Sequence, residues 1–141
     1  GLCVDLLITD ATLAEHQAAR QLLTRARRRK IHPKTLGADK GYHVKDFVQH
    51  LREHKIKPHI ARIDGRKTPG LDGRTSCTEG YKVSQRKRKR VEEIFGWLKT
   101  VGGMRKTRFI GQARTQIAAY LSAAAYNLLR IAKLQSAGSA A

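Results

Sequence analysis

The sequence is short of acidic side chains. Of its 141 residues, 11 are Asp or Glu and 29 are Lys or Arg, which gives a formal net charge of +18 at pH 7. So large an excess of one sign repels itself in a compact chain and is uncommon unless the partner is a polyanion. We therefore expect nucleic acid as the partner. The affinity of the protein for nucleic acid should fall steeply with salt, because each neutralised phosphate releases condensed counterions.

The sequence also has few cysteines and no long apolar run. Cys3 and Cys77 lack the paired spacing of zinc sites and are expected to be free thiols. No stretch approaches the ~20 apolar residues that cross a bilayer, and no secretory signal pattern is present. We expect a cytoplasmic protein without a membrane partner. The chain starts inside a strand-like stretch without an initiator Met, which is typical of a fragment.

The spacing of apolar residues predicts strands that alternate with helices. The predicted strands cover residues 2–9, 34–39 and 55–61, and the predicted helices cover 12–29, 44–54, 84–100 and 115–134. Asp10 or Thr12 is expected to cap the first helix. Phe47, Val48 and Leu51 are expected to face inward. The order of elements favours an α/β fold with right-handed crossovers.

Two segments are expected to lack fixed structure. Residues 62–80 hold four of the twelve glycines and few apolar side chains, which predicts a flexible loop within the domain. Residues 135–141 are of low complexity, which predicts a disordered tail. The folded domain is therefore expected to span residues 1–134. In its last helix, Asn127 is expected to make a polar contact.

The helix predicted over 84–100 places an acidic residue among many basic residues. On a helical wheel at ~100° per residue, one stripe carries Gln85, Arg88, Glu92 and Lys99. An adjoining arc, predicted to be buried, holds Val91, Ile94, Phe95, Leu98 and Val101. Glu92 at the margin of that arc and Asp39 at a strand end could supply hard oxygen ligands to one divalent metal.

A structural interpretation of the same acids stays open at this point. Arg88 with Glu92, and Lys89 with Glu93, could form ordinary ion pairs at i, i+4, each worth about 0.3–0.5 kcal/mol. Asp at the end of a strand often serves turn chemistry, and this applies to Asp39. The combination of the two acids with the basic stripe carries more weight than either alone.

Two stretches resemble DDE insertion-sequence transposases. LGADKGYHVKDFVQHLREHKIKPHIA is similar to their second-aspartate region, and RKRVEEIFGWLKT is similar to their glutamate helix. One bacterial group has a Tyr-Arg-Glu-Lys pattern with two, three and six intervening residues. Arg88, Glu92 and Lys99 match its last three positions, and Gln85 stands at the Tyr position. GGMRKTRFIG and AAYNLLRIAKL resemble the C-terminal end of that group.

The resemblance implies an RNase H-like fold, truncated here at the N-terminus with the first strands missing. Two Mg²⁺ or Mn²⁺ ions would be held by three carboxylates in the complete enzyme, and Asp39 and Glu92 would be two of these catalytic metal ligands. The first catalytic Asp would precede this chain, and neither Asp5 nor Asp10 replaces it. The chain alone is therefore expected to be inactive.

The resemblance also implies DNA chemistry and DNA contacts. The complete enzyme would cleave and rejoin DNA phosphodiesters during transposition, with the element ends and the target as partners. It would act as a homo-oligomer in the bacterial cytoplasm at the nucleoid. Arg88 and Lys99 would neutralise phosphate near the scissile bond. The flanking residues that would hold the DNA backbone are Arg86, Lys87, Lys89 and Arg90.

Other interpretations remain beside the transposase. The chain could be a non-catalytic basic nucleic-acid-binding protein, or a decayed gene remnant without function. His50 and His54 share a helix face at i, i+4, a spacing that suits zinc, although solvated histidines on a basic helix are commonplace. Neither HExxH nor a cysteine partner accompanies them.

Overall fold

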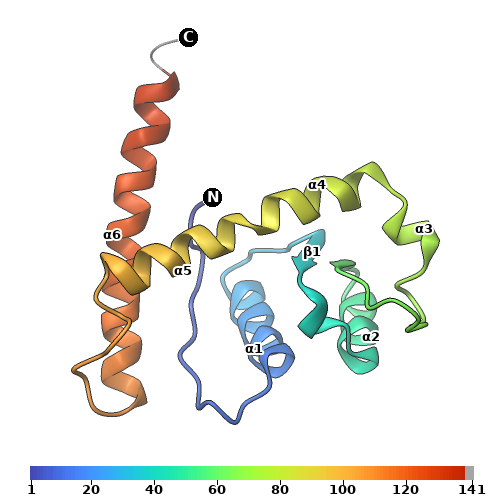
Figure 1. Ribbon diagram of the computed structural model, residues 1–141, viewed down its shortest axis with the longest axis horizontal. Helices are drawn as coiled ribbons and strands as arrows, with labels where there is room; N and C mark the ends of the chain where they lie inside the picture. Colours follow the sequence, from blue (N-terminus) through green and yellow to red (C-terminus); the bar gives the residue numbers. More distant parts are fainter. Residues whose placement is uncertain (139–141) are drawn as a thin grey trace. The chain divides into compact units, whose positions relative to one another are not determined.

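The computed structural model describes residues 1–138 and divides into two compact units. Unit 1 comprises Gly1–Ala11 and the chain from Arg90 onward, and unit 2 comprises Thr12–Lys89. Residues 139–141 of the predicted tail lie outside the described residues. Figure 1 shows the elements of each unit. In residues 1–138, every helix is too short or too polar to span a lipid bilayer.

Unit 2 is built on two parallel strands joined by a helix. In chain order its elements are α1 (Glu15–Arg28), β1 (Thr35–Ala38), the 3₁₀ turn η1 (Lys40–Tyr42), α2 (Lys45–Glu53), β2 (Lys57–Ile60), α3 (Gly73–Ser76) and α4 (Glu79–Arg88). The two strands pair in register, with Thr35 opposite Lys57. The predicted strands over 34–39 and 55–61 and the helices over 12–29 and 44–54 are therefore confirmed.

The core of unit 2 forms where α2 covers the strands. Phe47, Val48 and Leu51 are fully buried, as their helical spacing predicts. Further buried members of this cluster are Leu23, Ile56, Ile60 and Leu71. Burying each large apolar side chain contributes about 1.5–3 kcal/mol, so these few residues dominate the packing energy of a small unit.

The start of α1 differs from the prediction. The helix begins at Glu15 with Ala14 at the N-cap position, and no side chain caps it. The expected cap at Asp10 or Thr12 is therefore wrong, because the helix starts later in the chain. The acidic side chain of Glu15 lies in the first turn, where the helix dipole favours negative charge.

The segment 62–80 is more ordered than its composition predicts. It holds α3 and the start of α4, and Thr68, Leu71 and Thr75 are buried. The fully buried ring of His43 organises its first part: the ring Nδ1 accepts from the backbone N–H of Ile63 at 3.0 Å, and Nε2 donates to Thr68 Oγ1 at 2.9 Å. The hydrogen bonds of one buried ring thus hold the first part of this segment in place, although the segment has few apolar residues to bury.

Unit 1 contains two helices and an extended segment. Its helices are α5 (Arg90–Thr100) and α6 (Gln112–Gly138). The helix predicted over 84–100 is therefore divided into α4 and α5, with Lys89 between them. The helix predicted over 115–134 is longer at both ends, so residues 135–138 of the predicted disordered tail are helical.

The predicted strand over residues 2–9 does not form. The segment pairs with side-chain amides of α6 in place of another strand. Asn127 accepts from the N–H of Cys3 and donates to its carbonyl, both at 2.8 Å. Gln116 accepts from the N–H of Ile8 at 2.7 Å and donates to the carbonyl of Leu6 at 3.0 Å. The described sheet therefore has two strands rather than the expected three.

We predict that Asn127→Ala loosens this segment. The substitution removes both partners of the Cys3 peptide groups, and each part-buried group left unpaired costs about 1–3 kcal/mol. The amide proton of Cys3 should exchange faster with solvent, as measured by hydrogen exchange of the whole chain. Gln135→Ala, at an exposed position of the same helix, is the control and should leave that exchange rate unchanged.

We predict that unit 2 loses stability in mild acid, because His43 takes up a proton more readily in the unfolded chain than in the folded one. Burial, and then the positive charges of Arg66 and Arg62, lower the pKa of His43 below 6.5 in the folded state. The unfolded chain therefore takes up the proton first as the pH falls below 6.5, and the stability is lost progressively toward the lower folded pKa. Urea unfolding between pH 7.5 and 5 should show this loss.

The matched variants separate His43 from other histidines. His43→Gln should reduce the pH slope by up to about 1.4 kcal/mol per pH unit, the value for one proton. Burial also lowers the pKa of His59, so part of the slope should remain. His32→Gln, at an exposed position, should keep the slope of the unmodified chain. An unchanged slope in His43→Gln would contradict this assignment.

Candidate active site

Asp39 directly follows β1, at the carboxyl end of the parallel pair. Its side chain is exposed and caps η1, with Oδ1 accepting from the N–H of Gly41 at 2.9 Å. This hydrogen bond fixes the orientation of the carboxylate and confirms the turn chemistry expected of an Asp here. The second oxygen, Oδ2, accepts no hydrogen bond from the described residues of unit 2, so it is available to a ligand.

A second carboxylate, which the sequence reasoning missed, lies beside Asp39. A Cβ placed on Gly41 would lie 3.2 Å from Asp39 Oδ1 and 3.4 Å from Glu15 Oε2, so both oxygens border the same glycine. The Tyr42 hydroxyl lies nearby: burial raises its pKa, and the charges of Glu15 and Asp39 raise it further. The proximity of the two acids is visible only in the packing of α1 against η1, since they are far apart in sequence.

Helix α4 is held to β2 by hydrogen bonds from side chains. The Tyr81 hydroxyl donates to the carbonyl of Ile60 at 3.0 Å, and the Gln85 amide donates to the carbonyl of His59. The ring of His59 bonds through Nδ1 to Ser84 Oγ at 2.6 Å. Gly37 of β1 permits this approach, because a Cβ there would lie 3.3 Å from the Ser84 carbonyl oxygen.

Gln85 also orients Arg88. While its amide nitrogen binds the His59 carbonyl, its amide oxygen accepts from Arg88 Nε at 2.8 Å. Both bonds require the same orientation of the amide group, so the geometry is self-consistent. The residue at the Tyr position of the transposase pattern thus ties the pattern's Arg to the end of β2.

Glu92 lies in the first turn of α5 and is exposed. Two of the five apolar residues predicted to be buried beside it, Ile94 and Leu98, are buried. The prediction is wrong for the other three, since Val91, Phe95 and Val101 are 53%, 48% and 68% exposed. The buried face of α5 is therefore a narrow seam rather than a broad arc. Lys99 is exposed in the last turn of the same helix.

The predicted site residues are divided between the two units. Asp39 and Arg88 belong to unit 2, and Glu92 and Lys99 belong to unit 1. The shared metal site of Asp39 and Glu92 thus stays a prediction. So do the alternative ion pairs of Arg88 with Glu92 and of Lys89 with Glu93, since each joins the two units. Within either unit of the described chain, no ion pair involves Glu92 or Glu93.

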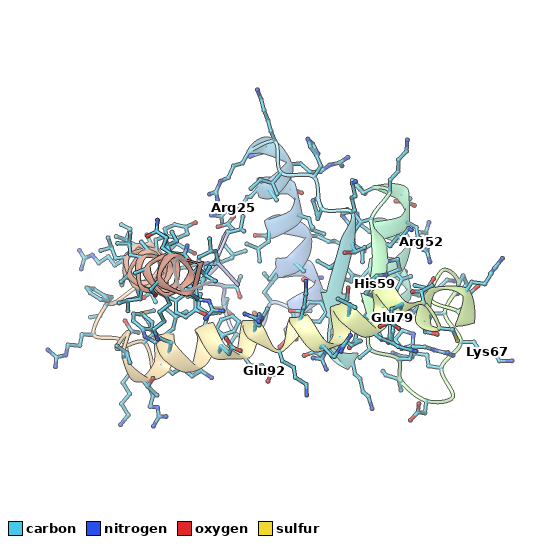
Figure 2. All side chains as sticks on the ribbon, turned by 90° about the horizontal axis from the view of Figure 1, so that it is seen from above. Arg25, Arg52, His59, Lys67, Glu79 and Glu92 are labelled. Carbon is cyan, nitrogen blue, oxygen red and sulfur yellow. The ribbon has the colours of Figure 1, made fainter. Side chains whose placement is uncertain are left out.

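The residues predicted to hold the DNA backbone are exposed. Arg86, Lys87, Lys89 and Arg90 all present their side chains to solvent. Arg86 lies 3.6 Å from a carboxylate oxygen of Glu79, which also pairs with Lys82 at 3.6 Å. Figure 2 shows Glu79 on α4 and Glu92 on α5 among the surrounding side chains. These pairs are exposed and weak, so a phosphate can displace Glu79 at little cost.

A cavity of ≈ 630 Å³ opens in unit 2 beside β2, and basic residues are among those that line it. Its cations are largely engaged within the protein. Arg52 donates to the carbonyl of Gly70 and to Thr75 Oγ1, and Arg74 pairs with Asp72 at 2.9 Å. Figure 2 labels Arg52 and His59, two of the lining residues. Asp39 is not among the lining residues, so we assign the cavity no catalytic role.

Comparison with known families supplies the context for these residues. The family model of the transposase DDE domain matches residues 1–128. The chain belongs to the DDE transposase family. No curated protein and no solved structure gives a match. The family generally acts on DNA and uses divalent metal ions, and it implies an RNase H-like fold, with which the small parallel sheet and its helices are compatible.

We predict that Gln85→Glu separates the two roles of Gln85. A carboxylate can still accept from Arg88, but it cannot donate to the His59 carbonyl, so this hydrogen bond between α4 and β2 is lost. The free energy of unfolding should fall by about 0.5–1.5 kcal/mol, the net contribution of one hydrogen bond, as measured by urea denaturation. Gln21→Glu, at an exposed position of α1, is the control. A loss no larger than in this control would show that the Gln85 bond does not hold α4.

Proposed function

We propose that Asp39 and Glu92 are catalytic metal ligands of a DDE transposase that cleaves and rejoins DNA phosphodiesters in the movement of an insertion sequence. The observation that carries the proposal is the placement of Asp39 at the carboxyl end of β1, in a chain whose residues 1–128 match the transposase DDE domain. Ligands in α/β sheets commonly bind at this end of the strands.

The donor atoms of this site suit a hard divalent cation. Asp39 Oδ2 and the exposed carboxylate of Glu92 are oxygen donors, which Mg²⁺ and Mn²⁺ prefer, and the complete site would hold two ions. When bound, such ions activate the attacking hydroxyl and stabilise the leaving oxygen of a phosphodiester. The hydrogen bond from Gly41 holds the Asp39 carboxylate in place before any ligand arrives.

The basic residues would bind the DNA phosphates. Gln85 pre-orients the guanidinium of Arg88, which reduces the entropy lost when it binds a phosphate in a bidentate manner. Lys99 would add a point charge. The exposed cations Arg86, Lys87, Lys89 and Arg90 would follow the backbone of the element ends and of the target. We expect a homo-oligomer that acts in the cytoplasm at the nucleoid.

The number of carboxylates limits what this chain can do. The family site uses three, and Asp39 and Glu92 match two of them. With two ligands the 141-residue chain should bind metal weakly and should not cleave DNA by itself. Cleavage of a DNA with the element ends, in the presence of Mg²⁺ or Mn²⁺, would show that another acid of this chain completes the site. Glu15, beside Asp39, is then the first residue to substitute.

We predict that Asp39→Asn and Glu92→Gln each weaken Mn²⁺ binding. Each substitution removes one anionic oxygen ligand and changes the shape of the side chain little. Affinity should fall at least about tenfold, since even the loss of a residue that orients a ligand costs 10–100-fold. Mn²⁺ binding can be measured by electron paramagnetic resonance, and DNA affinity by fluorescence anisotropy. DNA affinity should change little.

Neighbouring acids provide the matched controls. Glu93→Gln changes the adjacent residue of the same turn, and Asp46→Asn changes an exposed acid at the start of α2. Both should retain Mn²⁺ binding. Equal losses in Glu92→Gln and Glu93→Gln would instead favour a non-catalytic nucleic-acid-binding protein, whose acids act only through overall charge.

A further inference from the structure

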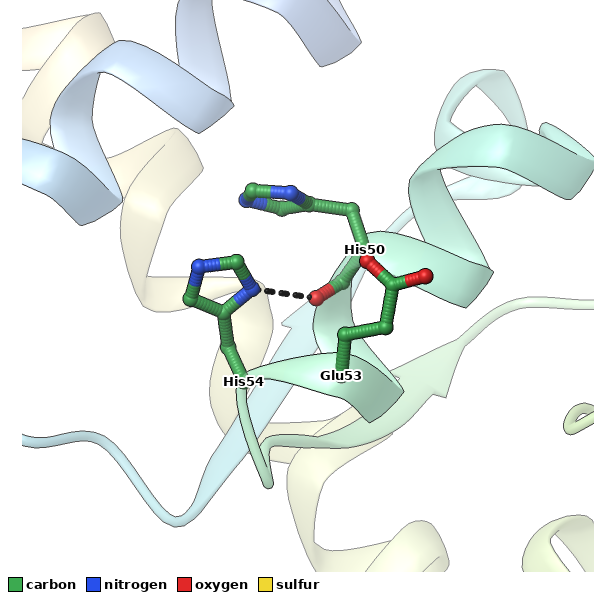
Figure 3. A group of neighbouring side chains, drawn as sticks. All are labelled: His50, Glu53 and His54. Carbon is green, nitrogen blue, oxygen red and sulfur yellow. Dashed lines mark hydrogen bonds between the residues drawn. The ribbon is translucent and has the colours of Figure 1, made fainter.

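Three potential metal ligands other than Asp39 and Glu92 gather on one side of α2. Single ligand atoms of His50, Glu53 and His54 all lie within 4.8 Å of one another. Figure 3 shows the two imidazole rings facing each other, with the carboxylate of Glu53 beside them. The ring centroids are 4.2 Å apart. All three residues come from a single stretch, HLREH, so they are close together whatever the arrangement of the two units.

Local hydrogen bonds leave suitable donor atoms free. His54 Nδ1 donates to the carbonyl oxygen of His50 at 2.8 Å, the bond drawn in Figure 3, so the lone pair of the neutral ring is on Nε2. Metal-bound histidines commonly have their other nitrogen held in this way. The amide of Gln49 donates to Glu53 Oε1 at 2.9 Å, which orients that carboxylate and leaves Oε2 for a ligand.

The position of Glu53 is unfavourable without a cation. It is the last residue of α2, where the partial negative charge of the helix dipole disfavours a carboxylate. In contrast, Glu15, Asp46, Glu79, Glu92 and Glu93 lie in first helical turns, where the dipole stabilises them. A cation bound between Glu53 and the two rings would remove this penalty.

Small side-chain movements can complete the geometry. Ligand atoms around a tetrahedral zinc ion are about 3.4 Å apart, because Zn–N and Zn–O bonds are close to 2.1 Å. His50 and His54 are half-buried and Glu53 is exposed, so their side chains can rotate to shorten the present separations. The charges of Arg20 and Arg27 act on His50 and oppose a cation, which weakens the site without blocking it.

We propose that His50, Glu53 and His54 form a binding site for a divalent transition metal of the Zn²⁺ class. Two imidazole nitrogens select Zn²⁺, Ni²⁺ or Cu²⁺ over Mg²⁺, which prefers oxygen alone. The spacing H-x-x-E-H also occurs on the zinc-binding helix of inverzincin enzymes, although no hydrolysis is proposed here. The site shares no residue with the pair Asp39 and Glu92 and does not depend on the function proposed for them.

The test is calorimetric titration of the whole 141-residue chain with Zn²⁺ alone. A Cys77→Ser background removes the exposed thiol, which could bind zinc by itself. One Zn²⁺ should bind per chain and raise the melting temperature. His54→Ala and Glu53→Gln should each weaken binding, the first by at least about tenfold, since it removes a ligand outright. Mg²⁺ in tenfold excess should not compete.

Controls separate this site from other histidines and from the proposed catalytic acids. His32→Ala removes an exposed histidine outside the cluster and should bind Zn²⁺ as the parent does. Asp39→Asn and Glu92→Gln should also leave Zn²⁺ affinity unchanged. Circular dichroism verifies that each variant is folded, and His50→Gln replaces His54→Ala if the latter unfolds. Absence of Zn²⁺ binding by the parent, or affinity within twofold of the parent in the folded histidine variant, would overturn the proposal.

Discussion

Both units of this chain depend on one constraint: extended backbone must find hydrogen-bond partners where no further strand provides them. Buried peptide groups left unpaired are costly, so some other group must take the place of a strand. In unit 1 the amides of Asn127 and Gln116 bind the peptide groups of the N-terminal segment. In unit 2 the Tyr81 hydroxyl binds the carbonyl of Ile60, at the edge of the two-stranded sheet. A side chain thus takes the place of a sheet neighbour in each unit.

The attachment of α4 to β2 also positions a residue of the proposed chemistry. Because the amide nitrogen of Gln85 donates to the His59 carbonyl, its amide oxygen is turned toward Arg88 and accepts from it. The hydrogen bond that attaches α4 to β2 therefore also fixes the guanidinium proposed to bind phosphate. The departure from the transposase pattern at Gln85 is thus compatible with an ordered Arg88.

The sequence predicted what depends on local periodicity and failed where distant partners decide. Apolar spacing alone predicts the strands around Leu36 and Pro58 and the three inward-facing residues of α2. The segment 2–9 has strand-like composition, but its backbone binds the amides of a helix more than a hundred residues away. No local pattern could indicate that. Asn127 was expected to make a polar contact, and it does so with Cys3, a partner that the sequence could not name.

The same distinction applies to the proposed sites. Asp39 and Arg88 were identified from spacing and resemblance, whereas Glu15 becomes visible only when α1 packs beside η1. Two carboxylates that border one glycine repel each other, and a divalent cation at Asp39 would relieve that repulsion. Glu92 differs, because a place in the first turn of a helix already stabilises a carboxylate without any metal. A place in the first turn of a helix therefore accounts equally well for an acid at Glu92 and at Glu93. Only a ligand that distinguishes between the two can assign Glu92 a catalytic role.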